Sequence, residues 1–260
     1  MSGNARDPGR STIDRLFTLL GVLGDGELTL AEIAQRSGLP LTTAHRILAA
    51  AEAWGGVERD PSGTYRIGLR LWELSNRSAA PAPLREIALP VLQDLYEATR
   101  ASVHLVVLDR DSALVVERVA GLRSVATRAE VGERLPLHAT AVGKVLLAHS
   151  SPALLAELGS RGLRRHTPHT VVMPGRLAAS VRAARDVGVA TAHEEFALGA
   201  ASIAAAVTGC DGSLRAAVGV VTYSHVTLTR YEAALRSATD RISRRLAARE
   251  DLPVLLRQPG

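Results

Sequence analysis

Cysteine is almost absent from this sequence. Its 260 residues include only one, Cys210, which lies beside a predicted turn at Asp211 and Gly212. A lone cysteine allows no intramolecular disulfide, and it excludes zinc modules that need several thiolate ligands. Because this cysteine use is typical of a reducing compartment, we expect a cytoplasmic protein. We interpret Cys210 as an incidental small residue, neither a nucleophile nor a redox sensor.

Aromatic residues and long apolar runs are also scarce. Phe, Trp and Tyr make up 3% of the chain and hydrophobic residues 47%, so Ala, Leu and Val have to build the core. The longest stretches of small, mostly apolar residues, 200–207 and 216–221, are well short of the ~20 residues that cross a bilayer. The first ten residues are polar and show no signal-peptide pattern. We therefore expect no membrane segment and no export.

Lysine is as rare as cysteine, because Lys144 is the only lysine among 31 basic residues. The formal net charge of +5 and the pI of about 10.1 suit an anionic partner. Residues 1–80, however, contain nine arginines and nine acidic residues, so their net charge is zero. The net charge therefore does not show which part of the chain would bind an anionic partner such as DNA, and the positions of individual residues have to decide this.

Capping and turn residues predict a winged helix-turn-helix in residues 1–68. Ser11 and Thr29 are good N-caps for the first two helices, and an acidic residue three positions after each completes a capping box. A third helix is expected to follow Pro40 and to end at about Trp54, before a glycine pair. A strand, a turn and a second strand are then predicted at 57–59, 60–63 and 64–67.

Residues 69–83 are predicted to form a linker helix and a hinge. Apolar residues at helical spacing continue through Leu69 and Leu74, and the stretch 78–83, with two prolines among small residues, is the clearest linker in the chain. We place the domain boundary there and assign residues 84–260 to a second domain.

Helices and strands are mixed in residues 84–260, which predicts an α+β domain around an antiparallel sheet. Strands are expected at 103–108, 113–119, 124–129, near Val189, and at 203–208 and 216–222. Helices are expected from Leu84 to about Leu95 and at 140–149, 175–186 and 229–249, with a loop at 132–137.

The third helix is the element expected to read DNA. Its apolar stripe consists of Ala44, Ile47, Leu48 and Ala51, which turns the opposite face outward. In a helix-turn-helix, the first residues of this helix enter the major groove. The candidate DNA contacts are Thr42, Thr43, His45 and Arg46 on this helix and Arg59 and Arg66 on the wing. Threonine hydroxyls can bond phosphates or base edges, Arg46 can bind guanine in a bidentate manner, and the wing arginines suit phosphates.

Two other interpretations of the N-terminal region stay open at this point. The three helices could form a small domain that docks protein, with Arg46 merely solvated. The whole chain could also be an accessory protein that senses a ligand without touching DNA. A salt-dependent mobility shift separates these interpretations from DNA binding.

An enzyme is the main alternative class, and its usual motifs are missing. There is no G-x-S-x-G nucleophile elbow, and His138 occupies the position where a P-loop ending in Gly143-Lys144 needs its first glycine. His166 and His169 could bind a metal with His193 or Glu194, but Pro168 argues against a regular helix that would align them. We expect no catalytic residue, no metal and no cofactor.

Three segments carry a resemblance to a known family. They are Ser37-Gly38-Leu39-Pro40, Thr43-Ala44-His45-Arg46-Ile47-Leu48, and 57–68 with its Asp60-Pro61-Ser62-Gly63 turn. Together they resemble the DNA-binding domain of the IclR (isocitrate lyase regulator) family. Members often have Lys-Ser-Thr where this chain has Leu41-Thr42-Thr43, which removes one phosphate contact and predicts a different operator.

The resemblance extends through the second domain. The run Gly132-Glu133-Arg134-Leu135-Pro136-Leu137-His138-Ala139-Thr140-Ala141, followed by Gly143-Lys144, is similar to the family's sensor motif. The segment from Gly188 through Glu194-Glu195, Leu198-Gly199 and Ser202-Ile203-Ala204 resembles its C-terminal signature. The resemblance implies a GAF-like α+β sensor domain joined by a helical linker to the winged helix-turn-helix. It also implies a dimer or tetramer on a palindromic operator and a small organic effector that controls operator affinity.

The implied effector contacts depart from the family in polarity. They are Leu137, His138, Ala139, Thr140, Ala192, Ser202, Gly219 and Val221. An acidic residue is usual where this chain has Ala192, and of Ser202, Gly219 and Val221 only Ser202 is polar. Because an unpaired buried charge is costly, we expect an effector less polar than the family norm, or one held mainly by backbone N–H groups. His138 either belongs to the pocket wall or satisfies hydrogen bonds in a structural turn.

Overall fold

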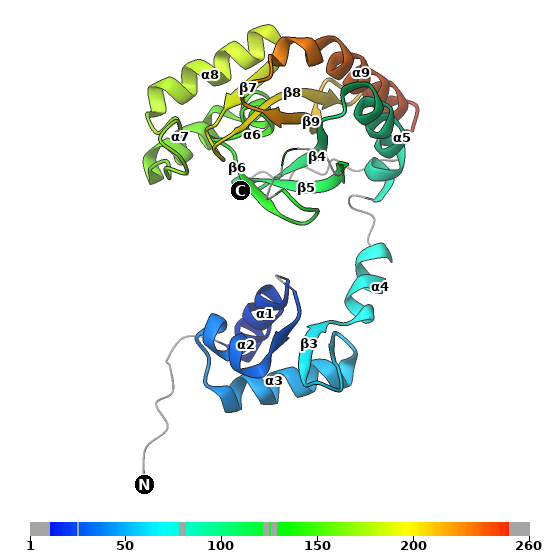
Figure 1. Ribbon diagram of the computed structural model, residues 1–260, viewed down its shortest axis with the longest axis vertical. Coiled ribbons are helices and arrows are strands. Elements are labelled where there is room, and N and C mark those ends of the chain that lie inside the picture. Colours follow the sequence, from blue (N-terminus) through cyan, green and yellow to red (C-terminus); the bar gives the residue numbers. More distant parts are fainter. Residues whose placement is uncertain (1–10, 25, 78–81, 122–124, 126–128, 250–260) are drawn as a thin grey trace. The chain divides into compact units, whose positions relative to one another are not determined.

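The chain divides into two compact units, residues 1–79 and 80–260 (Figure 1). The computed structural model describes residues 11–24, 26–77, 82–121, 125 and 129–249. Residues 78–81, which make up most of the predicted hinge, lie outside the described residues. Helix α5 begins at Ala82, so Pro83, which was assigned to the hinge, belongs to the first turn of a helix, where proline is tolerated.

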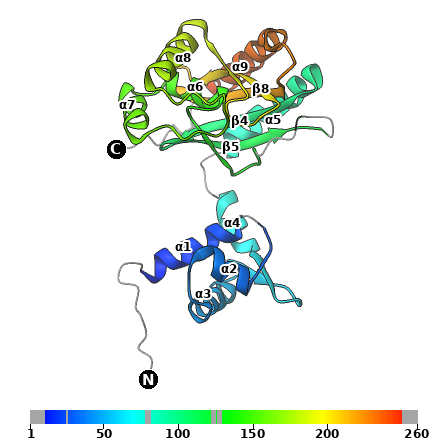
Figure 2. The same ribbon diagram turned by 60° about the vertical axis from the view of Figure 1, so that its left-hand side comes forward.

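The N-terminal unit has the predicted order of three helices and a hairpin, which confirms the helix-turn-helix and its wing. Its elements are α1 (Thr12–Leu23), β1 (Leu28–Thr29), α2 (Leu30–Ser37), α3 (Leu41–Trp54), β2 (Val57–Arg59), β3 (Thr64–Ile67) and α4 (Leu69–Arg77). The two-residue strand β1 was not predicted. It joins the wing to make a three-stranded sheet in the order β1-β3-β2. Figure 2 shows α1, α2 and α3 gathered around one centre.

Local chemistry explains where these helices begin and end. The Ser11 hydroxyl accepts from the Asp14 amide, and the Asp14 carboxylate accepts from the Ser11 amide at 2.9 Å. Thr29 and Glu32 form the same capping box at the start of α2. The tight turn between α2 and α3 uses Gly38 in the left-handed region, at φ 68°, where a side chain is disfavoured.

The C-terminal unit is an α+β domain built on a six-stranded sheet. Its elements are α5 (Ala82–Thr99), β4 (Ser102–Asp109), β5 (Ser112–Val119), β6 (Arg134–Pro136), α6 (Ala141–Ala148), α7 (Pro152–Arg161), α8 (Pro174–Val187), β7 (Val189–His193), β8 (Ala200–Thr208), β9 (Leu214–Tyr223), the 3-10 helix η1 (Leu228–Tyr231) and α9 (Glu232–Ala247). Adjacent strands in the order β6-β5-β4-β9-β8-β7 are all antiparallel, as predicted.

Four parts of this domain differ from the sequence prediction. The predicted loop 132–137 contains the short strand β6, which pairs with β5, and helix α7 was not predicted at all. Of the strand predicted at 124–129, only Val125 and Ala129 are among the described residues, and neither belongs to a strand. The prediction for 229–249 missed that the segment opens with the 3-10 turn η1.

Helices cover both faces of the sheet. One core forms where α5 and α9 pack on alternate residues of β4, β8 and β9, such as Val103, Ile203 and Val218. The second core forms on the opposite face, where α6 and α8 pack on residues such as Val106 and Ala217 (Figure 1). The register pairs His104 of β4 with Gly219 of β9, and Gly219 with Ala204 of β8, so these three residues share the face that α6 covers.

Two glycines allow α6 to pack closely. A Cβ on Gly143 would lie 2.4 Å from the Leu137 backbone, and a Cβ on Gly219 would lie 2.6 Å from Cγ1 of Val142. Both distances are shorter than real side chains tolerate. The helix start is capped by Thr140, whose hydroxyl accepts from the Gly143 amide and donates to the carbonyl of Pro136.

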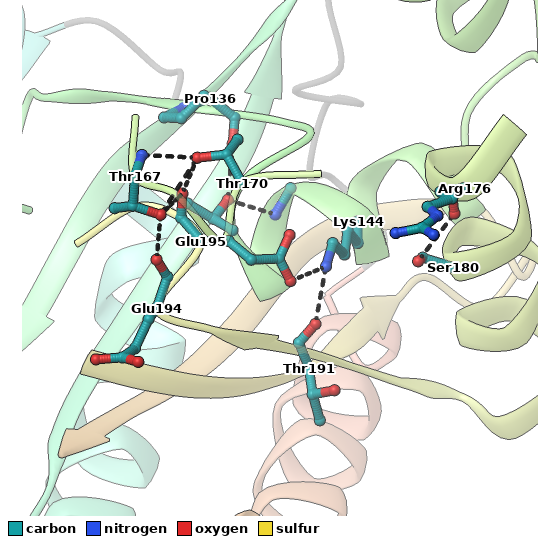
Figure 3. A network of polar contacts seen from close by, with 11 residues as sticks. Pro136, Lys144, Thr167, Thr170, Arg176, Ser180, Thr191, Glu194 and Glu195 are labelled. Carbon is teal, nitrogen blue, oxygen red and sulfur yellow. Dashed lines mark hydrogen bonds and ion pairs between the residues drawn. The ribbon is translucent and has the colours of Figure 1, made fainter. Parts of the chain in front are cut away.

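A buried ion pair joins α6 to the segment after β7 (Figure 3). Nζ of Lys144 lies 2.5 Å from Oε1 of Glu195 and donates to the carbonyl of Thr191 at 3.1 Å. Both charged side chains are buried, with Lys144 3% exposed. Each charge therefore depends on the other, because water is excluded from both.

Among the residues that the structure describes, no helix combines the length and apolar character needed to cross a bilayer.

Replacing Lys144 with Met is expected to lower the free energy of unfolding by about 3–5 kcal/mol, because Glu195 is then buried without a cation. Urea unfolding followed by circular dichroism measures this loss. The double variant Lys144→Met/Glu195→Gln removes both charges and should recover most of it.

The matched control for the buried pair is Arg241→Met. This change breaks the exposed pair with Asp94, in which the two side chains are 2.7 Å apart, and should cost less than about 1 kcal/mol. Equal losses in Lys144→Met and Arg241→Met would contradict a special role for the buried pair.

Candidate functional site

The outward face of α3 presents polar side chains at the start of the helix. Thr42, His45 and Arg46 are exposed, and Thr43 is half-buried at the edge of the face. The opposite stripe is buried as predicted, and it consists of Ala44, Ile47, Leu48 and Ala51. No side chain among the described residues caps the helix at Pro40, so the first amides of α3 point outward without a side-chain acceptor. Such a helix N-terminus attracts anions such as phosphate.

The two wing arginines differ in how far their charge is offset. Arg66 lies between two carboxylates, 3.0 Å from Glu58 and 3.5 Å from Glu27, and both raise the pKa of its guanidinium. Arg59 lies 5.3 Å from the ring centre of the buried Tyr65 and has no ion pair within the described part of the chain. The guanidinium of Arg59 is therefore the freer of the two to meet an anion.

The N-terminal unit also exposes apolar side chains on α1. Ile13 and Phe17, one turn apart, are 63% and 64% exposed. Beside them is a groove of about 240 Å³ that α1 and α3 line together with Leu71.

A cavity of about 600 Å³ opens on the α6 side of the sheet in the C-terminal unit. Its size is within the range of small-molecule sites. The sheet forms the floor, the start of α6 forms one wall, and two connecting segments, 164–168 and 195–198, form the rest. The lining residues of the floor and the α6 wall are His104, Ala139, Thr140, Val142, Ala192, Ala200, Ala201, Ser202, Gly219 and Val221.

The structure brings six of the eight predicted effector contacts together around this cavity. They are Ala139, Thr140, Ala192, Ser202, Gly219 and Val221. Leu137 and His138 are buried and are not among the lining residues. His138 Nε2 is 2.8 Å from the carbonyl oxygen of Arg164, and its ring lies 5.6 Å from that of His166. These contacts match the alternative in which His138 satisfies a structural turn.

Several polar residues of the cavity were missed from the sequence. They are His104, Arg164, Arg165, His166 and Glu195. These groups come from β4 and from loops outside the contacts inferred from the family, and they add to the polar Thr140 and Ser202 that were predicted. One signal was available in the sequence, since His104 is the only polar residue between Val103 and Leu108 in an otherwise apolar strand.

His104 lies on the floor of the cavity and is only 2% exposed. Burial and, to a smaller extent, the nearby Arg118 guanidinium lower its pKa to about 4. The imidazole is therefore neutral at physiological pH. Its cross-strand neighbours are Gly219 on β9 and Arg118 on β5.

The rim of the cavity is basic. Arg164 and Arg165 are exposed there, and neither has an ion pair within the described residues. His166 lies beside them, 5.1 Å from the ring of Phe196. Burial, His138 and Arg164 all lower the pKa of His166.

Two threonines hold the rim segment against the segment after β7 (Figure 3). The Thr167 hydroxyl donates to the carbonyl of Glu194 at 2.6 Å, and the Thr170 hydroxyl donates to the carbonyl of Glu195 at 2.7 Å. The Thr170 hydroxyl also accepts from the amides of His166 and Thr167. These bonds position both cavity walls relative to one another.

The candidate metal ligands His166, His169, His193 and Glu194 do not form one cluster. His169 Nε2 is 3.7 Å from a carboxylate oxygen of Glu194. Within the described ranges, no three His, Cys, Asp or Glu side chains lie close enough together to hold a metal ion.

Family models match most of the chain. The IclR helix-turn-helix domain matches residues 12–61, and the bacterial transcriptional regulator IclR C-terminal domain matches residues 77–246.

Individual relatives agree with these matches. The HTH-type transcriptional regulator BhcR of Paracoccus denitrificans is 31% identical over 245 residues, which cover 93% of this chain and 86% of the relative. The transcriptional repressor IclR of Escherichia coli is 31% identical over 187 residues, which cover 70% of this chain and 68% of the relative.

A solved structure is also similar along nearly the whole chain. It is an IclR homologue from Microbacterium hydrocarbonoxydans complexed with 4-hydroxybenzoate. It is 31% identical, with a TM-score of 0.86, and the match covers 92% of this chain and 100% of the homologue. The chain has a helix-turn-helix followed by an α+β domain that holds a ligand-sized cavity. Its relatives are transcriptional regulators and not enzymes. This chain therefore belongs to the IclR family of DNA-binding transcriptional regulators, which have a C-terminal effector-binding domain.

Proposed function

We propose that α3 is the recognition helix and that it reads the major groove of an operator. The observation that carries this proposal is the exposed polar face of α3 at a helix start that no described side chain caps. Arg46 is assigned to a guanine, because its guanidinium can bind the O6 and N7 acceptors together. Thr42, Thr43 and His45 are assigned to base edges or to the adjacent phosphates.

The wing is proposed to contact the DNA backbone. Arg59 is the stronger candidate for a phosphate, because no carboxylate in the described residues offsets its charge. Arg66 contributes less, since Glu58 and Glu27 already surround its guanidinium. This arrangement supports a DNA-binding surface in a domain whose net charge is close to zero.

We further propose that the effector is an organic acid with an apolar body. Arg164 and Arg165 supply positive charge at the rim of the cavity, where a carboxylate keeps part of its hydration. Small apolar residues such as Ala192, Ala201 and Val221 line the interior. The relative solved with 4-hydroxybenzoate supports an acid of this size. The sequence suggested an effector less polar than the family norm, or one held mainly by backbone N–H groups, and that stays a prediction. Arg164 and Arg165, which that prediction did not consider, favour the acid.

The domains are proposed to act as a coupled pair. Residues 1–68 bind DNA, residues 69–83 connect, and residues 84–260 bind the effector, so that effector and operator affinities change each other reciprocally. A dimer or a tetramer on a palindromic operator fits this scheme, and the exposed Ile13 and Phe17 offer an apolar face for self-association. Binding to a bacterial operator places this action in the cytoplasm.

Replacing Arg46 with Ala is expected to weaken specific operator binding about 10- to 100-fold, the equivalent of about 1–3 kcal/mol for a bidentate contact. Arg46→Lys keeps the charge but loses the bidentate guanidinium geometry. Its operator binding should keep the same salt dependence and lose the base preference at one position. Fluorescence anisotropy at two salt concentrations, with competitor DNA present, measures both effects.

The control for Arg46 is Arg182→Ala, which removes the same charge from an exposed position on α8. This variant should bind the operator as the parent chain does. If Arg46→Ala also binds as tightly as the parent, the assignment of α3 as the reading helix is wrong.

Replacing both Arg164 and Arg165 with Gln is expected to weaken the binding of 4-hydroxybenzoate at least about tenfold, because two charge-assisted contacts are lost. Isothermal titration calorimetry gives the affinity. Arg161→Gln is the control, since this exposed arginine pairs with Asp111 at 3.1 Å and does not line the cavity. An unchanged affinity in the double variant would exclude these arginines as the acid-binding group.

A further inference from the structure

Buried polar atoms without partners gather at the effector cavity. Six side-chain polar atoms within the described residues are buried and make no hydrogen bond, and three of them belong to residues that line this cavity. These three are His104 Nε2, His166 Nε2 and Glu195 Oε2. Buried polar groups are normally hydrogen-bonded, and leaving one unpaired is costly. Such a concentration of unpaired atoms marks a place where a ligand supplies the missing partners.

His104 is the most deeply placed of the three. It is 2% exposed and lies on the sheet floor, whereas the rim residues Arg164 and Arg165 are exposed. Its neighbour on β9 is Gly219, which has no side chain that could cover or bond the imidazole. Its neighbour on β5 is Arg118, whose guanidinium donates to Glu130. Neither neighbouring strand therefore supplies a partner for the buried Nε2 of His104, a residue that lines the cavity.

The chemistry of these atoms selects the ligand group. A neutral imidazole carries one donor and one acceptor nitrogen. The carboxylate of Glu195 can only accept, and Lys144 occupies Oε1 alone, so Oε2 requires a donor. A ligand carboxylate has no proton to give, whereas a hydroxyl group both donates and accepts. A ligand hydroxyl group can therefore pair with the imidazole in either tautomer and can also donate to a carboxylate oxygen, which a ligand carboxylate cannot do.

We propose that His104 is a specificity-determining residue that hydrogen-bonds an uncharged hydroxyl group of the effector on the cavity floor. The effector is then a hydroxylated organic acid, held with its carboxylate at Arg164 and Arg165 and its hydroxyl group inward. This inference rests on the proposed function, in which the cavity binds an organic acid. It adds the deep contact that separates hydroxylated acids from their unsubstituted analogues.

The test compares matched acids on the full-length chain by isothermal titration calorimetry. The probes are 4-hydroxybenzoate and 3-hydroxybenzoate, each against benzoate. The parent chain should bind at least one hydroxylated acid about 10- to 100-fold more tightly than benzoate, since benzoate leaves the floor atoms unpaired. His104→Leu should remove this preference and bind both acids with the affinity of benzoate. His104→Gln keeps a hydrogen-bonding group and should restore part of the preference.

The matched control is His166→Leu, which removes the unpaired imidazole at the rim. This variant should weaken the binding of the hydroxylated acid and of benzoate by the same factor, so that the ratio of the two affinities stays unchanged. A second readout needs no ligand. His104→Leu replaces an unpaired buried polar group with an apolar one, so its melting temperature should rise, whereas a histidine with a structural role would make it fall.

Any of the following results would overturn the inference about His104. Equal affinity for both acids in the parent chain, or a preference that survives in His104→Leu, excludes the contact with the hydroxyl group and leaves the organic-acid proposal standing. Loss of benzoate binding in His104→Leu shows that the carboxylate, not the hydroxyl group, meets the imidazole. Binding of none of the acids overturns the inference together with the proposed effector class. Operator binding by the parent chain without ligand tests DNA recognition separately.

Discussion

One buried ion pair joins two walls of the cavity in the C-terminal unit. The only lysine of the chain, Lys144, extends from α6 to Glu195 in the segment after β7, and neither charge is stable in that place without the other. The pair fixes the helix against the far end of the sheet, while Gly143 and Gly219 let the same helix approach the floor. It also uses only one oxygen of Glu195, so that the second stays available to the cavity. The ion pair thereby leaves one carboxylate oxygen of Glu195 for the proposed binding site.

Placement rather than net charge distinguishes the two wing arginines. Arg59 and Arg66 carry the same charge on adjacent strands of one hairpin, yet two carboxylates surround Arg66 and none in the described residues pairs with Arg59. A neutral N-terminal half can therefore still present cationic groups to DNA where they are needed. In the proposed DNA complex, the acidic residues around Arg66 limit nonspecific attraction to phosphates, which leaves a larger share of the binding energy to the proposed contacts of α3.

Local features of the fold were predictable from the sequence, and long-range ones were not. The capping boxes at Ser11 and Thr29, the buried stripe of α3 and the wing hairpin all follow from residues within a few positions of one another. Strand β6 is three residues long and is defined by pairing with β5, which no local pattern reveals. The same holds for the cavity, because His104, Arg164 and Glu195 are brought together only by the sheet register and the packing of α6. The family resemblance indicated the wall near residue 138, but packing turned Leu137 and His138 away from the lining.

Small side chains explain why this face of the sheet holds a cavity beside its hydrophobic core. Ala192, Ser202 and Gly219 occupy positions on β7, β8 and β9 where the opposite face carries larger residues such as Ile203 and Val218. The resulting space has the unpaired Nε2 of His104 at its base, and the proposed ligand contact removes the cost of burying that atom without a partner. A ligand that relieves this cost stabilises the conformation in which α6, the rim segment and the floor keep their present spacing. Any influence on the operator must come from that difference in stability, because a ligand shifts a conformational equilibrium only by its unequal affinity for the states involved.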